Sequence, residues 1–434
     1  MRQSAQPKSV WYERLTKAAA YSLPEIPIIL AALIYTNSRG LQRSLGAIAF
    51  YYPYAMFGAG LLLGWRFHRS RLLFALLVLA LVDRSLLAFV ASHGFTRDHV
   101  AFQAIAFLLP LNLAALALTA ERGVFTPPGL VRLSVILGQV ALVAILDRGA
   151  PGAAGALLHA RLLPPSWFAW TPLADPALLA FLVAAGLMGA GQLLSPTATG
   201  RSFCWSLLPA FLGLSAVRAG NPGFSTFYFA TSALILIIAV VEASYHMAYQ
   251  DSLTQLPARR ALNEALLRLG SQYTVGMVDV DHFKRINDSH GHDVGDQVLK
   301  MVAARLAQVG GGGRAYRYGG EEFAVIFPGK GAEECLPELE ALRKVVEDAK
   351  FILRSRIRSK RKKEKILAEK GPGRRVPVTV SIGVACARPN EAQGPGDLIE
   401  AADAALYAAK HRGRNTVVGH GFVRASDGAV ALAS

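Results

Sequence analysis

Arg317-Tyr-Gly-Gly-Glu-Glu-Phe323 is the stretch of this 434-residue chain that decides its fold. β-forming residues at 315–318 and 323–327 flank it, which predicts a hairpin with two glycines and two carboxylates at its turn. Glycine permits a positive φ and lets a charged ligand approach the backbone, while a carboxylate at the tip can hold a divalent cation. The hairpin therefore suits phosphate chemistry, although an ordinary acidic hairpin would share these features.

A second β-forming run, 273–281, ends in Asp279-Val280-Asp281. The spacing indicates a metal-binding Asp279 beside the carbonyl of Val280, with a different task for Asp281. A strand that ends in a polar turn has the same composition, so the pair alone decides nothing. If Asp279 and Glu321 converge from two strand ends, they can hold Mg²⁺ against a triphosphate.

Charge and hydropathy divide the chain into two parts. The first 243 residues hold 17 Lys or Arg against 8 Asp or Glu, which leaves 29 against 22 for the remainder. The basic excess is concentrated in one block, 354–375, and beside apolar stretches, and it forms no stripe interleaved with aromatic residues. We therefore expect no nucleic-acid partner. The three cysteines form no C-x-x-C pair, which indicates neither a disulfide framework nor a zinc site.

Residues 1–243 predict an all-α transmembrane bundle that acts as a sensor or anchor. Its basic N-terminus lacks a small-residue cleavage pattern, which predicts an uncleaved anchor. The positive-inside rule favours both termini in the cytoplasm. Eight apolar stretches of roughly the length that spans a bilayer lie at 19–36, 46–64, 72–92, 100–120, 130–147, 177–194, 203–219 and 224–243, the seventh being the weakest.

Asp83 and Arg84 fall inside the third apolar stretch, where an unpaired charge is unfavourable by a few kcal/mol. Three interpretations remain open. The residues form a ligand or proton site, Asp83 pairs with a neighbouring arginine, or the span boundaries differ from those given by about one helical turn.

Six motifs occur in order between residues 251 and 415 and carry a resemblance to a known family. They are D-S-L-T-x-L, D-V-D-H-F-K-x-I-N-D, G-H-x-x-G-D, R-Y-G-G-E-E-F, V-T-V-S-I-G-V-A and A-D-x-A-L-Y-x-A-K-x-x-G-R-N. Together they resemble the GGDEF family of diguanylate cyclases over residues 251–420. The resemblance implies an α/β palm-like, ferredoxin-like nucleotide cyclase domain in a homodimer at a bacterial inner membrane. Such a domain condenses two GTP into cyclic di-GMP and releases pyrophosphate.

The resemblance also assigns roles residue by residue. Two Mg²⁺ per site, with Mn²⁺ as an alternative, would be bound by Asp279, Val280, Glu321 and Glu322. The catalytic residues would be Glu321, as the base for the ribose 3′-hydroxyl, and Lys284. Nucleotide contacts would come from Phe283, Lys284, Asn287, His292, Asp296, Lys410 and Arg414. Asn and Asp suit the amide edge of guanine and cations suit a triphosphate, although Lys410 and Arg414 could instead cap their helix.

Departures from the family pattern are few. Gly310-Gly-Gly-Gly313 stands where the R-x-x-D product-inhibition motif is usual, so we expect no feedback inhibition there. Ala258 and His290 replace a usual Asn and Tyr. Two rival functions are a catalytically silent GTP receptor, which would have a broken acidic motif, and a transporter, for which the spans show no internal repeat.

Three smaller segments complete the expected organisation. Residues 244–250 should form a short connecting helix, and 421–434 a disordered tail. The block 354–375 reads as a basic insertion, either a solvated loop or a contact with anionic lipid in the membrane.

Overall fold

The computed structural model describes residues 24–93, 100–148, 152–162, 164, 171, 173–349, 351–352, 375–387, 394–419, 422–424 and 430–432. The basic N-terminus and all but Arg375 of the expected insertion lie outside the described residues. The chain divides into two compact units, Met1–Ser244 and Tyr245–Ser434.

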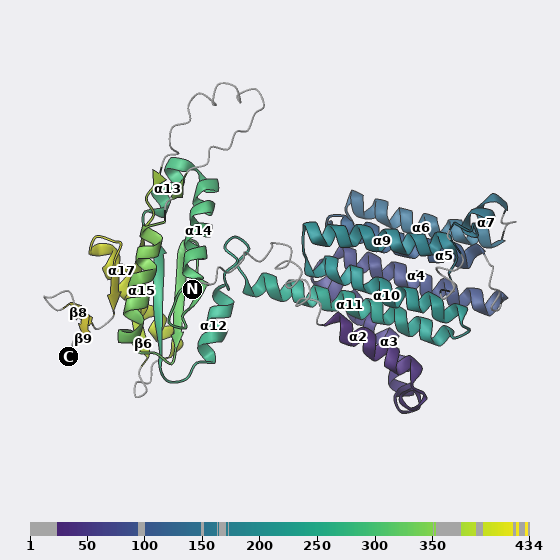
Figure 1. Cartoon of the computed structure of the whole chain (residues 1–434), viewed down its shortest axis with the longest axis horizontal. Helices are drawn as coiled ribbons and strands as arrows, with labels where there is room; N and C mark the ends of the chain where they lie inside the picture. The colour runs from purple at the N-terminus through teal and green to yellow at the C-terminus, as the bar shows by residue number, and fades with distance from the viewer. Residues whose placement is uncertain are drawn as a thin grey trace, which may run out of the picture. The chain divides into compact units, whose positions relative to one another are not determined.

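Within its described residues, the first unit consists of helices that run side by side (Figure 1). In chain order they are α2 (Glu25–Asn37), α3 (Arg39–Arg66), α4 (Ser70–His93), α5 (Val100–Leu118), α6 (Pro127–Arg148), α7 (Gly152–Leu158), α9 (Asp175–Leu194), α10 (Ala198–Arg218) and α11 (Pro222–Tyr249).

Six of these helices, within the part of the chain that the structure describes, are long and apolar enough to cross a membrane. They are α3, α4, α5, α6, α9 and α11. The expected first span corresponds to α2, which has 13 residues, and the expected seventh span corresponds to α10, which includes Arg201 and several serines. The six apolar helices are consistent with the expected transmembrane bundle, and the count of eight spans stays a prediction.

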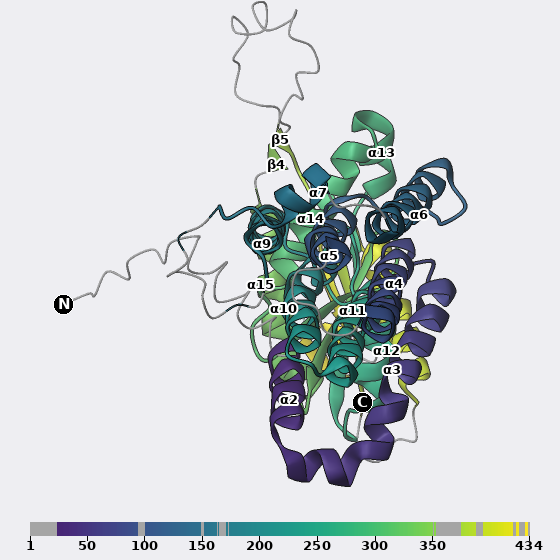
Figure 2. The same cartoon turned by 90° about the vertical axis from the view of Figure 1, so that its right-hand side faces the viewer.

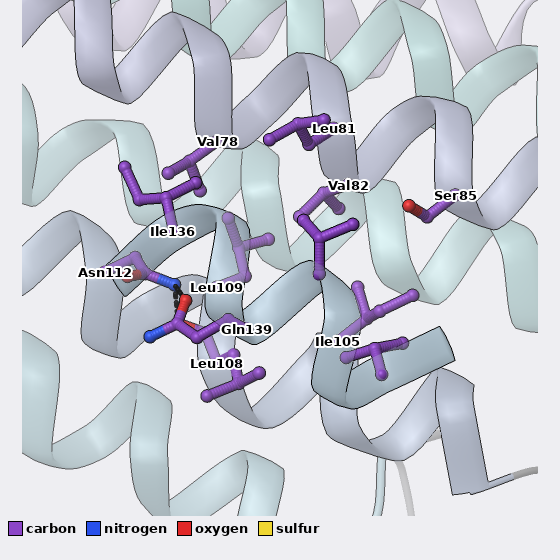
Figure 3. Close-up of a pocket in the computed structure, with 12 residues that line it drawn as sticks. Val78, Leu81, Val82, Ser85, Ile105, Leu108, Leu109, Asn112, Ile136 and Gln139 are labelled. Atoms are coloured by element: carbon purple, nitrogen blue, oxygen red, sulfur yellow. Dashed lines mark hydrogen bonds between the residues drawn. The ribbon is translucent and has the colours of Figure 1, made fainter. Parts of the chain in front are cut away.

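The centre of the bundle is apolar and includes α5, whose Ala106, Leu109 and Leu113 are fully buried. Figure 2 views the bundle nearly end-on, with α2 and α3 at its lower edge. One polar contact interrupts the apolar packing between α5 and α6. There Asn112 Nδ2 donates to Gln139 Oε1 at 2.7 Å, and Figure 3 shows the two amides pointing toward each other.

A buried ion cluster joins three helices of the first unit. Arg201 of α10 donates through Nε to Glu25 Oε1 of α2 at 2.7 Å and through Nη2 to Glu242 of α11. Ser202 also donates to Glu25 Oε1, at 2.9 Å. Because separating one partner of a buried ion pair typically costs about 3–5 kcal/mol, the cluster fixes the start of α2 and α10 against α11.

The second unit is built on a five-stranded mixed sheet in the order β2-β3-β1-β6-β7. β1 pairs antiparallel with both β3 and β6, and β6 pairs parallel with β7. The strands are β1 (Tyr273–Val280), β2 (Arg314–Arg317), β3 (Glu322–Pro328), β6 (Val380–Ala387) and β7 (Val417–Gly419). Every residue of β1 is buried, because neighbours flank it on both edges and helices cover both faces.

Two pairs of helices cover the two faces of this sheet. On one face α14 (His292–Leu306) and α15 (Ala332–Glu347) pack on Val278 and Val280. On the other, α12 (Arg259–Leu267) and α17 (Pro395–His411) pack on Val275 and Met277. Gly383 permits the close approach of α17, since a Cβ there would lie 2.1 Å from the backbone N of Leu406.

The remaining elements are short. α13 (Phe283–His290) follows β1, while β4 (Phe351–Ile352) pairs with β5 (Arg375–Val376). In the expected disordered tail, β8 (Phe422–Arg424) pairs with β9 (Val430–Leu432), so its described residues form a small ribbon instead.

The mixed α/β sheet confirms the expected fold class of the C-terminal part. The expected strands at 273–281, 315–318 and 323–327 correspond to β1, β2 and β3. The expected connecting helix at 244–250 is the end of α11, which is one continuous helix of 28 residues. No breaker residue interrupts it after Val241.

Candidate active site

The candidate active site lies at the end of β1, where Asp279 faces Glu322 of β3 across the antiparallel ladder. The backbone N–H of Val280 donates to the carbonyl of Glu321 at 3.3 Å, which joins the hairpin to β1. Lys410, in the last turn of α17, brings its Nζ to 2.8 Å from Oδ2 of Asp279. Residues from three distant parts of the sequence therefore meet at one point.

The acids at this point are electrostatically coupled. Burial raises the pKa of Asp279, and the hydrogen bond and positive charge of Lys410 oppose this effect without cancelling it. Burial also raises the pKa of Glu321, and repulsion from Asp279 raises it further. Because both carboxylates are unfavourable as neighbouring anions, a cation between them would stabilise their ionised forms.

The donor set fits a cation that arrives with a phosphate substrate. Among the described residues, no group of three or more His, Cys, Asp or Glu side chains could hold a metal. The protein would instead offer two carboxylates, Asp279 and Glu321, and the carbonyl of Val280. Mg²⁺ is commonly held by one or two carboxylates, with phosphate oxygens and water completing its shell.

Arg317 holds the hairpin in shape. Its Nε and Nη2 donate to the carbonyls of Gly319 and Gly320 at 3.1 and 2.7 Å, and its Nη1 donates to Oδ1 of Asp251 at 2.6 Å. Arg317 N also donates to the carbonyl of Pro257 at 2.8 Å. The segment that opens the second unit is therefore tied directly to the glycine turn.

The two glycines of the hairpin do not use the positive φ that glycine permits. Neither Gly319 nor Gly320 has a positive φ. The turn between Arg317 and Glu322 is long enough to close with ordinary dihedrals. A Cβ at Gly319 would lie 2.9 Å from Glu322 Oε2, and one at Gly320 would meet no atom within 4 Å. The pair leaves the tip open to a ligand.

Asp281 has a structural task that is distinct from that of Asp279. Its carboxylate accepts hydrogen bonds from the hydroxyls of Thr379 and Ser381, both at 2.7 Å, and from the backbone N of Asn415 at 3.0 Å. Asn415 follows Arg414, and both have a positive φ in the turn after α17. Asp281 thus anchors the turn that carries Arg414, whose charge acts on the carboxyl of Asp279.

Asn287, on α13, has a side-chain oxygen without a hydrogen-bond partner among the described residues. Within the described residues its Oδ1 is buried and has no hydrogen bond. Gly295 of α14 makes room for it, because a Cβ at that position would lie 1.9 Å from this oxygen. Buried polar atoms are nearly always bonded, so an unpaired Oδ1 indicates a place for a ligand donor.

The other predicted nucleotide contacts lie on the surface of the same helix pair. Lys284, His292 and Asp296 are exposed, and their side chains have no hydrogen bond or ion pair among the described residues. Phe283 begins α13, where the first backbone N–H groups have no partner within the helix and can face an anion. The predicted site residues thus form two clusters. One consists of the acidic residues and Lys410 at the end of β1, and the other lies on α13 and α14.

Residues 248–416 match the family model described as "Diguanylate cyclase, GGDEF domain". The matched segment contains the hairpin, Asp279, Asn287 and Lys410. These residues form a GGDEF domain.

Curated relatives share this GGDEF domain. Response regulator PleD of Caulobacter vibrioides is 37% identical over 188 residues, covering 41% of this chain and 37% of that protein. Diguanylate cyclase VdcA of Vibrio cholerae is 36% identical over 172 residues, covering 39% of this chain and 46% of that protein. The chain thus spans less than half the length of these relatives.

A solved structure is also similar. It is the coiled coil and GGDEF domain of DgcB from Caulobacter crescentus in complex with c-di-GMP, with 34% identity and a TM-score of 0.36. The similarity covers 41% of this chain and 89% of that one.

Sequence reasoning assigned no role to Arg317, Asp251 or Asn415 in shaping the GGDEF domain. Asp251 opens the D-S-L-T-x-L motif and Arg317 opens the R-Y-G-G-E-E-F motif. Their opposite charges were the one sign in the sequence that the two residues could pair. Hydrogen bonds from Arg317 and Thr254 outweigh the effect of burial and lower the pKa of Asp251. The ionised form therefore contributes stability above the unfolded pKa of about 4, and this contribution is lost as pH falls further.

Replacing Arg317 by Ala should lower the catalytic rate of the GGDEF domain about tenfold to a hundredfold. The change removes two charge-assisted hydrogen bonds from the hairpin and one from Asp251, and the expected loss of rate corresponds to about 1.4–2.7 kcal/mol of transition-state stabilisation. Arg317→Lys should not restore the rate, because an ammonium group lacks the planar fork. The measurement is the initial rate of product formation by the full-length protein.

Arg268→Ala serves as the control, since Arg268 forms an exposed pair with Glu264 at 3.3 Å. Asp251→Asn combined with Arg317→Ala should be little worse than Arg317→Ala alone, as expected for two partners of one interaction. Full activity of Arg317→Ala would show that the hairpin keeps its shape without this side chain.

Proposed function

We propose that this chain is a membrane-bound diguanylate cyclase, which condenses two GTP into cyclic di-GMP and releases pyrophosphate. The observation that carries the proposal is the meeting of Asp279, Glu321 and Lys410 at the end of β1, beside an open glycine hairpin. The GGDEF match and the relatives named as diguanylate cyclases support it.

The chemistry is a pair of phosphoryl transfers. In each, the ribose 3′-oxygen of one GTP bonds to the α-phosphorus of the other, and the bond to the departing pyrophosphate breaks. Glu321 would take up the hydroxyl proton, with Glu322 as a supporting carboxylate. Lys410 would exchange its contact with Asp279 for one with the triphosphate, assisted by Lys284 and Arg414 and by the N–H of Phe283.

Mg²⁺, when bound by Asp279, Glu321 and the Val280 carbonyl, would neutralise charge on the triphosphate. Two such ions per site, with Mn²⁺ as an alternative, would agree with the small set of protein ligands. Lys410 also places a positive charge at Asp279.

Guanine recognition would fall to α13 and α14. The unpaired Oδ1 of Asn287 can accept from the amide edge of guanine, and the carboxylate of Asp296 can accept from its amino group. His292 lies in the same motif. An adenine ring presents a different donor pattern to these acceptors, so the pair would select GTP.

Catalysis would require a homodimer, because each domain binds one GTP and the product joins two. The apolar helices of the first unit support a multi-pass membrane protein. Its membrane would be the bacterial inner membrane, and the positive-inside rule favours both termini in the cytoplasm. Control by the first unit would then act through α11, which continues without a break into the second unit.

Glu321→Gln should reduce the rate of cyclic di-GMP formation by about a hundredfold or more, because the variant cannot take up the proton or bind the cation. The assay incubates the full-length protein in nanodiscs with GTP and Mg²⁺ and separates the products by chromatography. Glu333→Gln, on an exposed position of α15, is the matched control and should keep the full rate. Absence of any cyclic dinucleotide from the unmodified protein would refute the proposal.

Gly295→Ala should raise the KM for GTP about tenfold and change kcat much less. Its methyl group would displace Asn287 from the position that accepts a donor of guanine. Asn287→Ala should have the same effect, and Gly270→Ala, where a Cβ meets no atom within 4 Å, should have none. Steady-state kinetics with GTP measure KM and kcat separately. An unchanged KM in both Gly295→Ala and Asn287→Ala would argue against guanine binding here.

Feedback inhibition by cyclic di-GMP at 310–313 should be absent. Gly310 and Gly311 offer no cation for the product's phosphates, and the side chain of Glu338 lies against both. The initial rate of the unmodified protein should therefore stay constant as cyclic di-GMP is added. Inhibition that a substitution at Glu338 or Gly310 alters would contradict this expectation.

A further inference from the structure

A cavity of about 440 Å³ lies in the first unit, where α2 ends and α11 begins. Its walls come from α2, α3, α4 and α11. This volume falls in the range of about 300–1,000 Å³ that is usual for small-molecule sites. None of the residues proposed for the cyclase site lines it.

Aromatic rings form much of the wall. Tyr35 of α2 stacks on Phe227 of α11 with centroids 4.7 Å apart, and Phe50 and Tyr54 of α3 lie 6.0 Å apart on another wall. Such rings present flat apolar faces and, in tyrosine, a polar tip. The wall therefore favours an apolar or aromatic body over a purely polar solute.

Arg84 supplies the charge in this cavity. Its Nε donates to Oδ2 of Asp83 at 3.1 Å, and its Nη2 donates to the same oxygen. Asp83, whose side chain is 3% exposed, also accepts from the hydroxyl of Thr226 at 2.7 Å. The pairing of Asp83 with a neighbouring arginine, one of the alternatives from the sequence, is thus confirmed.

The pairing leaves Arg84 available to a ligand. Asp83 holds one edge of the guanidinium, and Nη1 has no hydrogen bond among the described residues. The Arg84 side chain is 59% exposed and lines the cavity. A buried acid thus orients a guanidinium whose free N–H groups can meet an acceptor.

The smaller cavity in Figure 3 is a useful contrast. It has a volume of about 60 Å³, and its amides, Asn112 and Gln139, bond to each other at 2.7 Å. Ser85 on its rim is the other polar side chain among its lining residues. The smaller cavity therefore has neither the space nor a charged side chain to bind a ligand that would fill the larger one.

We infer that the larger cavity is a binding site for an amphipathic anion, a carboxylate or phosphate joined to an apolar or aromatic body. The guanidinium of Arg84 binds the anionic oxygens, since Arg matches carboxylate and phosphate geometry with two parallel N–H groups. The rings of Tyr35 and Phe227 hold the apolar body. A free organic acid and a phospholipid head group share this chemistry, and the inference does not depend on the cyclase activity.

The ligand would touch the first turns of α11. Phe224, Thr226 and Phe227 line the cavity, and Tyr228 Oη lies 2.7 Å from the hydroxyl of Thr36 on α2. A bound ligand would therefore change the contacts that hold the start of α11 in the bundle.

Binding of 2-naphthoate to the purified full-length protein in phosphatidylcholine nanodiscs tests the free-acid source. The unmodified protein should bind it saturably, and Arg84→Gln should weaken binding about tenfold or more. Arg43→Gln, on an exposed position of α3 outside the cavity, removes the same charge and should bind normally.

A second variant tests the cavity without touching the ion pair, because Arg84→Gln leaves Asp83 unpaired and could impair folding. A Cβ at Gly46, which lines the cavity, meets no atom within 4 Å, so Gly46→Leu should fill the space and weaken binding about tenfold or more. Gly58→Leu is the matched control, since Gly58 is equally free on the same helix but does not line the cavity.

The lipid source is tested in parallel by delipidation from phosphatidylglycerol nanodiscs and native mass spectrometry of retained lipid. Retention by the unmodified protein and by Gly58→Leu, with loss in Gly46→Leu and Arg84→Gln, supports the site with a lipid as its ligand. Naphthoate binding with the same variant pattern supports it with a free acid as its ligand. If neither probe distinguishes Gly46→Leu from Gly58→Leu, the inference is overturned.

Discussion

The guanidinium of Arg317 is the contact on which the catalytic end of the second unit depends. Its hydrogen bonds to Gly319 and Gly320 shape the turn, and its ion pair with Asp251 ties that turn to the segment that follows α11. A glycine pair has no side chains with which to define its own conformation. The turn therefore takes its shape from a donor outside it, and the position of Glu321 follows from that shape.

β1 is the second organising element, because it lies in the middle of the sheet and pairs on both edges. Its final residues serve two loops. Asp279 faces the hairpin and Lys410, while Asp281, just beyond the strand, binds the backbone of Asn415 after α17. Arg343 and Glu347 of α15 bond to the Asn415 side chain at 2.6 and 2.7 Å. The acid site and the cationic turn thus share one rigid support.

α11 plays a comparable part in the first unit. Near its start, Thr226 bonds to the buried Asp83 beside the aromatic cavity, and toward its end Glu242 bonds to Arg201. The same helix continues to Tyr249, whose carbonyl accepts from Ala258 N and whose hydroxyl bonds to Glu264 of α12. Charged and polar groups at both ends of an apolar helix fix its position where apolar packing alone would permit sliding.

The sequence by itself determined the two-part organisation, the α/β class of the second part and the strand ends at Asp279 and Glu321, because hydropathy, β propensity and local motifs are written along the chain. It also indicated the family, since the six ordered motifs can be recognised in the sequence without knowing which residues are in contact. It could not reveal that Lys410 reaches Asp279, that Arg317 holds the glycine turn, or that Asn287 keeps an unpaired oxygen in space left by Gly295. It could not decide the φ of the glycine pair, because turn length and an external donor set that dihedral. The sequence also could not reveal the aromatic cavity, because its walls come from helices far apart in the chain. These features belong to the tertiary structure, because distance in space, burial and the saturation of each donor and acceptor are set only when distant segments pack together.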